Sequence, residues 1–200
     1  MFGQRYVATK QAAGLQDTNT WYDYYKADPL GVDVQKFETP FQTGEYENSF
    51  SAGAGALIGT TADDGKAFSS KLFLLLSLPE VFILEGKANI MGEKVGFSTS
   101  EPPFYAFLAI SKDSVEAGFG AKYKLPKDSG DILDVYGDIN LGFFFHNPKA
   151  WYINIGTKDK PITARMLSFF NAQAYLSIAA KGIEAGAKTG LDFSKKYLGG

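Results

Sequence analysis

The stretch that decides the fold is residues 107–118, FLAISKDSVEAG. A related stretch, YLSIAAKGIEAG, occupies residues 175–186, sixty-eight positions further along the chain. In both, an apolar strand leads through a short turn into a returning strand, and Glu-Ala-Gly is repeated outright. A match at a fixed period indicates that one supersecondary unit is used more than once.

The match extends outward from this stretch. Residues 71–79, KLFLLLSLP, align with residues 140–148, NLGFFFHNP, and residues 81–86 align with residues 151–156. The sequence therefore predicts an all-β fold, an antiparallel meander built from tandem four-stranded repeats of about 68 residues. We expect a large curved sheet, roll or barrel-like structure that belongs to a longer β-repeat protein.

Composition divides the chain into three parts. Residues 1–50 are polar and predict an irregular lead-in with one or two strands, residues 51–193 hold the tandem repeats (about 51–125 and 126–193), and residues 194–200 begin a further unit or form a tail.

Period-two alternation assigns the faces of the strands. In residues 115–125 the side chains of Val115, Ala117 and Phe119 point one way, and that of Glu116 points the other. We interpret the apolar side as the buried core of the sheet. The residues predicted to define this core in the two copies are Phe107, Leu108, Ile110, Val115 and Ala117, and Tyr175, Leu176, Ile178, Ile183 and Ala185.

Two sets of residues are candidates for an interaction or binding site. The aromatic cluster Trp21, Tyr22, Tyr24 and Tyr25 could form an interaction surface such as a sugar-stacking platform, or could cover the open end of a sheet. Glu116 and Glu184 are carboxylates at equivalent repeat positions. They could form a ladder that binds cations, or could be polar-face residues that pair with lysines across the sheet.

Composition argues against several classes of function. The net charge of −2 gives no electrostatic case for nucleic acid. The chain has no cysteine, and its single histidine, His146, lies in a His-Asn-Pro turn without a nucleophile or carboxylate in register. We therefore predict no enzyme, no catalytic residues, no metal site and no cofactor.

The leading functional expectation is a structural or interaction module of a larger bacterial-type assembly. Its partners would be other copies of the repeat or other subunits, bound through sheet edges and apolar faces. One alternative is a fragment of an outer-membrane β-barrel, since strands of about ten alternating residues rich in Tyr, Phe and Gly suit that class. Only this alternative involves a membrane. A third is a carrier that encloses an apolar ligand. The N-terminus shows no signal peptide, and the cellular location stays open, with an extracellular or surface-associated bacterial location among those compatible.

Overall fold

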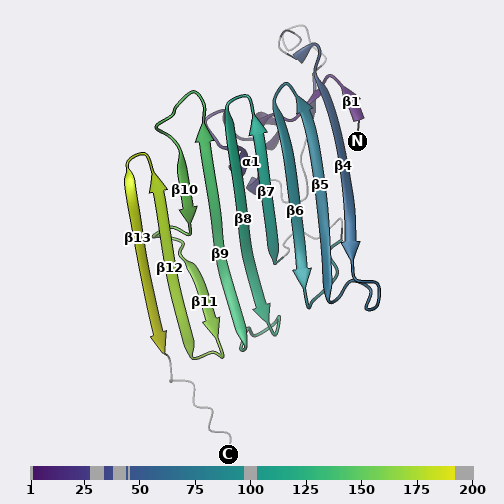
Figure 1. The fold of residues 1–200 in the computed structure, drawn as a ribbon. Coiled ribbons are helices and arrows are strands. Elements are labelled where there is room, and N and C mark those ends of the chain that lie inside the picture. The colour runs from purple at the N-terminus through teal and green to yellow at the C-terminus, as the bar shows by residue number, and fades with distance from the viewer. Residues whose placement is uncertain (1, 28–33, 38–43, 45, 97–102, 192–200) are drawn as a thin grey trace, which may run out of the picture.

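Eleven strands form one antiparallel sheet in which neighbours in space are mostly neighbours in sequence (Figure 1). The computed structural model describes residues 2–27, 34–37, 44, 46–96 and 103–191. The meander runs through β4 (Phe50–Gly59), β5 (Phe68–Leu78), β6 (Val81–Ile90), β7 (Phe104–Ser111), β8 (Ser114–Leu125) and β9 (Leu133–Phe144). It continues through β10 (Tyr152–Ile155), β11 (Ile162–Met166), β12 (Phe170–Ala179) and β13 (Gly182–Leu191).

Two short strands share one position in this sheet. β10 and β11 both lie between β9 and β12, each pairing with part of both neighbours. Gly156 follows β10 with a φ of +65°, and its backbone N–H donates to the carbonyl of Asp138 on β9. A side chain at this φ would be strained, so glycine suits the break between the two strands.

The outer strands of the sheet differ in length. β1 (Phe2–Gln4) pairs with the first three residues of β4, whereas at the other edge β13 pairs with β12 over ten residues.

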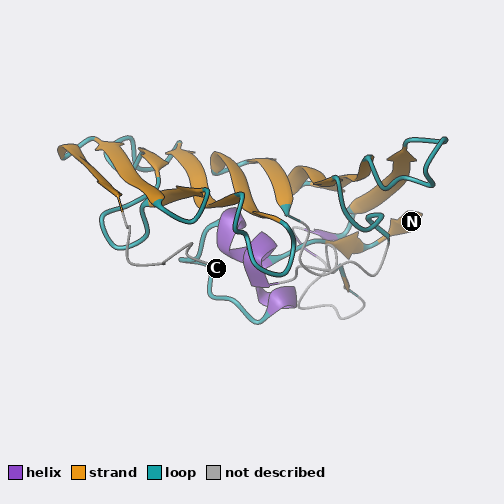
Figure 2. Cartoon of the chain, turned by 90° about the horizontal axis from the view of Figure 1, so that it is seen from below, coloured by secondary structure: helices purple, strands orange, loops and turns teal. Residues whose placement is uncertain are grey.

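The N-terminal segment lies against one face of the sheet, and the other face is bare (Figure 2). This segment contains β2 (Tyr6–Val7) paired with β3 (Gln35–Lys36), the 3-10 helix η1 (Lys10–Ala13) and the helix α1 (Trp21–Ala27). Within the described residues, no helix is long and apolar enough to cross a membrane.

The buried cluster lies between the N-terminal segment and the sheet. The segment contributes Ala8, Trp21, Tyr24 and Tyr25, and the sheet contributes Leu75, Val81, Ile83, Phe107 and Ala109. All five sheet residues point to the same face, as the register of β5 to β7 requires. This is the only face on which the sheet buries a core within the described residues.

The prediction of an antiparallel β-meander is confirmed. Residues 1–50 contain short strands and also η1 and α1, which the sequence analysis did not predict. The expectation for residues 194–200 falls outside the described residues.

Candidate functional site

The two faces of the sheet have opposite chemistry. Continuous register carries one row of side chains across the sheet: Ala56, Leu72, Gly86, Ala106, Phe119, Ile139, Ile155, Leu176 and Ala185. We call the side of β4 to β13 that carries this row the apolar face. Its strand positions are all apolar or glycine except for three hydroxyl residues, Ser70, Tyr123 and Thr189, so within these ten strands it carries no charge.

The apolar face is exposed. Leu72 is 40% exposed, Leu78 49% and Phe119 48%, although all three belong to long, regularly paired strands. Soluble proteins rarely leave contiguous apolar patches of more than a few hundred Å² uncovered. Nine strand positions at about 4.8 Å spacing and strands about 30 Å long give this face roughly 1,300 Å².

This exposure corrects the sequence-based assignment of the core. Leu108, Ile110, Val115, Ala117, Leu176, Ile178, Ile183 and Ala185 lie on the apolar face, where Ile110 is 44% and Ile183 73% exposed. Phe107 and Tyr175 lie on the opposite face, and of the ten residues only Phe107 is in the buried cluster. Alternation separated the two faces correctly in β8 and β13, but not for the adjacent residues Phe107–Leu108 and Tyr175–Leu176, and the face that the chain covers is the polar one.

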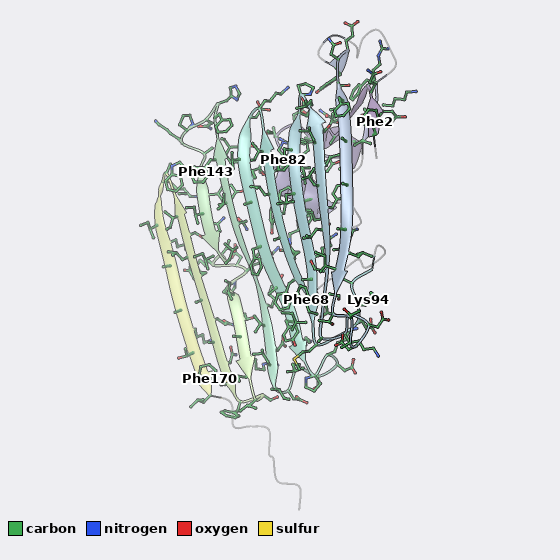
Figure 3. All side chains as sticks on the ribbon, turned by 45° about the vertical axis from the view of Figure 1, so that its right-hand side comes forward. Phe2, Phe68, Phe82, Lys94, Phe143 and Phe170 are labelled. Atoms are coloured by element: carbon green, nitrogen blue, oxygen red, sulfur yellow. The ribbon has the colours of Figure 1, made fainter. Side chains whose placement is uncertain are left out.

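Aromatic side chains gather at both ends of the apolar face. Phe50, Phe82 and Phe143 lie toward one end of their strands, and Phe68, Phe104, Tyr123 and Phe170 lie toward the other. Figure 3 shows Phe82 and Phe143 at one end of the sheet and Phe68 and Phe170 at the other. Between the two rows the face consists mainly of Leu, Ile, Val and Ala.

The opposite face, which we call the polar face, buries charged and hydroxyl groups. Lys87 and Glu85 form an ion pair with 3.0 Å between Nζ and Oε1, and their side chains are 2% and 1% exposed. The hydroxyl oxygens of Ser51 and Ser77 lie 2.9 Å apart, and Ser77 also accepts the backbone N–H of Ala8. The polar face therefore forms specific contacts with the N-terminal segment.

The Glu116 carboxylate forms a hydrogen bond with the backbone of the first turn of α1. Its Oε2 accepts the backbone N–H of Tyr22 at 3.0 Å, and its Oε1 accepts the Ser114 hydroxyl at 2.8 Å. Glu116 is fully buried, so both hydrogen bonds form away from bulk water. One of the two repeated carboxylates is thus an attachment point for α1.

Strand glycines make room for aromatic rings on the polar face. A Cβ at Gly118 would lie 2.3 Å from the Tyr22 ring, and one at Gly120 would lie 2.2 Å from the Tyr105 ring. Glycine in a strand interior marks such close approach. Only a residue without a side chain lets α1 lie this close to β8.

The far end of α1 is held by a charged cluster. Lys26 donates to the Tyr105 hydroxyl, which in turn donates to Asp138 on β9. The Lys26 Nζ lies 3.7 Å from Asp138 Oδ2 and 4.1 Å from the centre of the Tyr105 ring. Burial lowers the pKa of Lys26, and the nearby Asp138 carboxylate opposes that change.

Tyr22 and Tyr25 of α1 are held in their neutral form. Burial raises the pKa of Tyr22 to about 12, although the hydrogen bond with Tyr105 acts in the other direction. Burial also raises the pKa of Tyr25, whose ring stacks on Phe107 with centroids 4.7 Å apart.

We expect alkaline pH to release α1 from the sheet. An unfolded tyrosine ionises near pH 10, whereas folded Tyr22 keeps its proton to about pH 12. Between these values the unfolded state binds fewer protons, so stability present below pH 10 falls as the pH rises toward 12. Thermal unfolding followed from pH 8 to about 12 checks this, and Tyr22→Phe should have a shallower slope. An unchanged slope in Tyr22→Phe would contradict the assignment to Tyr22.

The aromatic candidates are packed against the sheet. Trp21, Tyr24 and Tyr25 are buried, and Tyr22 is half-buried, so the rings cover the polar face instead of forming an exposed platform. The sequence does contain a signal for α1. The hydroxyl of Thr20 accepts the backbone N–H of Asp23, and the Asp23 carboxylate accepts the backbone N–H of Thr20. This reciprocal capping box, followed by aromatic residues at helical spacing, indicates a helix start.

The repeated carboxylates have different surroundings. Glu184 pairs with Lys158 at 3.7 Å and its side chain is 56% exposed, in contrast to buried Glu116. In the structure the two carboxylates do not form a common site. His146 lies 3.4 Å from Asp113, and both are largely exposed. No group of three or more His, Cys, Asp or Glu side chains that could hold a metal occurs among the described residues.

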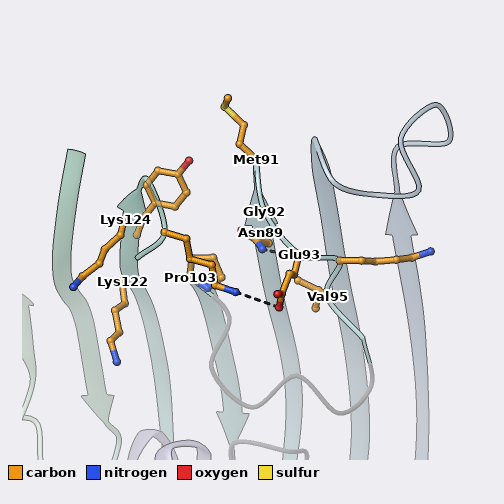
Figure 4. A pocket seen from close by; sticks show the side chains of 11 residues that line it. Asn89, Met91, Gly92, Glu93, Val95, Pro103, Lys122 and Lys124 are labelled. Carbon is orange, nitrogen blue, oxygen red and sulfur yellow. Dashed lines mark hydrogen bonds and ion pairs between the residues drawn. The ribbon is translucent and has the colours of Figure 1, made fainter. Parts of the chain in front are cut away.

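A lysine-rich cavity of about 340 Å³ lies where β6 and β8 reach their C-terminal ends (Figure 4). Lys94, Lys122, Lys124 and Lys127 line it together with Glu93 and Tyr123. Lys127 pairs with Glu93 at 3.1 Å, and Lys94 pairs with Asp64 at 2.8 Å. At least two of its lysines are thus balanced by carboxylates, which weakens the case for an anion site.

Comparison with known proteins gives no family for this chain. No protein-family model matches it, and no curated protein and no solved structure matches it either. The functional argument therefore depends on the chemistry of the two faces.

Proposed function

We propose that this sheet spans a lipid bilayer, as part of the wall of an outer-membrane β-barrel. In this proposal the apolar face contacts lipid, and the polar face, with α1 on it, faces the lumen. The role is structural and non-enzymatic. The observation that carries the proposal is the inverted polarity: the chain covers the face with the buried ions and leaves an uncharged apolar face bare.

The dimensions of the apolar face suit a bilayer. On β9 it extends from Leu133 to Phe143, ten residue steps, which correspond to about 33 Å along the strand. At a tilt of about 40° this projects to about 25 Å, the height of the apolar band on membrane-spanning barrels. The aromatic rows at its two ends occupy the level of the lipid headgroups, where aromatic rings are favoured.

The chemistry of the polar face also fits a lumen. Transmembrane strands alternate apolar residues toward lipid and polar residues toward the interior. Buried Lys87, Glu85 and Glu116 would be costly next to hydrocarbon but are readily accommodated beside water and a folded segment.

We further propose that the two halves of the sheet are tandem copies of one unit. The pairs Ile110–Val115 in β7–β8 and Ile178–Ile183 in β12–β13 occupy the same place in hairpins of the same register. β5 to β8 would form one copy. The second would contain β9, the β10–β11 position, β12 and β13. Superposition of the two halves, each as four strand positions, tests this, and failure of the strands outside the hairpins to align would contradict it.

Vesicle flotation tests the membrane proposal. We expect the full chain, refolded with phosphatidylcholine vesicles, to float with the lipid and to stay bound in alkaline carbonate, because its apolar face is buried in hydrocarbon. The same chain without lipid or detergent should aggregate. A monodisperse soluble species that does not float would overturn the proposal, and would point to a protein partner on the apolar face, as in the leading expectation from sequence.

A further inference from the structure

β13 has an outer edge without the features that usually protect one. Within the described residues it pairs only with β12, in continuous register over ten residue pairs. It contains no proline and no bulge, and its two charged residues, Glu184 and Lys188, point to the polar face. Natural sheets normally block a free edge with prolines, bulges or inward-pointing charges.

The direction of the strands restricts what can pair with this edge. β4 to β13 comprise ten strands, and because β10 and β11 share a place they occupy nine positions. All neighbours are antiparallel, so with nine positions β4 and β13 run in the same direction (Figure 1). β13 therefore cannot pair antiparallel with β4, whether of this sheet or of a second copy with the same orientation in the membrane.

Self-pairing of β13 is also excluded in a membrane. Antiparallel pairing of β13 with β13 of a second copy needs a two-fold axis perpendicular to the sheet. That axis would insert the second copy upside down, which conflicts with a single insertion direction.

We infer that the outer edge of β13 is paired by a further antiparallel, amphipathic strand of about ten residues. The inference rests on the proposed function, because hydrocarbon offers no water to bond unpaired N–H and C=O groups. The strand's apolar residues lie beside Ile183, Ala185 and Leu191 on the lipid side. On the lumen side it places a basic or hydroxyl residue beside Glu184 and an acidic or hydroxyl residue beside Lys188. Closure of the sheet by antiparallel pairs onto β4, beyond the three residues of β4 that already pair with β1, then needs an odd number of added strand positions.

A backbone ester scan of the full chain in phosphatidylcholine vesicles tests the inference. Ala185→lactic acid, Gly186→glycolic acid and Ala187→lactic acid each replace one backbone amide by an ester. Each variant therefore lacks one backbone N–H group, without the ring that a proline would introduce. Successive N–H groups of a strand point to opposite edges, so the three variants sample both edges of β13. We expect each to lower the melting temperature by about 2–4 °C.

The test depends on which of the three ester variants has a lower melting temperature. If the edge is free, removal of outward N–H groups leaves the melting temperature unchanged, so position 186 would differ from positions 185 and 187, and this would overturn the inference. Ala172→lactic acid and the α-hydroxy acid analogue of glutamine at Gln173, both on β12, are matched controls, since β12 is paired on both sides at these residues. Flotation separates the two proposals. If the chain floats with the vesicles but position 186 differs from positions 185 and 187, the membrane proposal stands and the inference of a further strand is wrong.

Discussion

Leu176→Lys is expected to destabilise the membrane-bound sheet by about 2–4 kcal/mol, the usual effect of a lysine in the middle of a lipid-facing strand. Leu176 lies on the apolar face in the row that contains Leu72 and Ile139, both well inside their strands. A lysine there would hold its ammonium group in hydrocarbon, too far from the headgroups to reach water easily. Urea unfolding in phosphatidylcholine vesicles measures the change, and flotation should fall with it.

The neighbouring residue supplies the control. Ser177 points to the polar face and lies opposite Glu184, so Ser177→Lys should be neutral or slightly stabilising. Two adjacent substitutions that introduce the same charge are thus expected to differ by several kcal/mol. For a sheet in water, both would be surface changes within about 0.5 kcal/mol of the parent. Equal effects of the two variants would contradict the assignment of the lipid face.

Gly118→Val is expected to displace α1 from the sheet and to lower stability by about 2–4 kcal/mol, the upper range for overpacking. The new Cβ would lie 2.3 Å from the Tyr22 ring, and the Tyr22 backbone is bound to Glu116 next to it. This hydrogen bond holds the Tyr22 backbone close to Gly118, so the ring must leave its rotamer or α1 must move away. Because Trp21 is 2% exposed, its fluorescence should shift to the red and become quenchable by iodide.

Two variants make this measurement specific. Trp151→Phe removes the other tryptophan, so that the signal reports on Trp21 alone. Gly190→Val on β13 places the same side chain on the same face where no atom lies within 4 Å of a built Cβ, and it should leave the fluorescence of Trp21 unchanged. An unshifted spectrum in Gly118→Val would show that α1 does not depend on this contact.

Alternation and turn residues were enough to predict most of the strands. Residues 107–118 predict a hairpin, and they form the second half of β7, the turn and the start of β8. Local alternation also separates Glu116 from Val115 and Ala117 correctly. These features depend on residues close in the chain, so sequence patterns report them directly.

The sequence did not reveal which face is covered. Alternation has the same form whether the apolar side faces a core or a lipid, and the usual assumption places it inside. The buried Glu85–Lys87 pair and the contact of α1 with Glu116 arise between segments far apart in sequence. Only their positions in the folded chain show that the polar face is the covered one.

By itself the sequence determined the antiparallel meander and the two-sided chemistry of strands such as β8. The tertiary structure decided where the N-terminal segment lies, that it covers the polar face, and that the apolar face is left bare (Figure 2). The physical reason is the distance in sequence between the residues that interact. Strand formation follows from local alternation and turn chemistry, whereas the choice of face follows from contacts such as Tyr22 to Glu116, 94 residues apart.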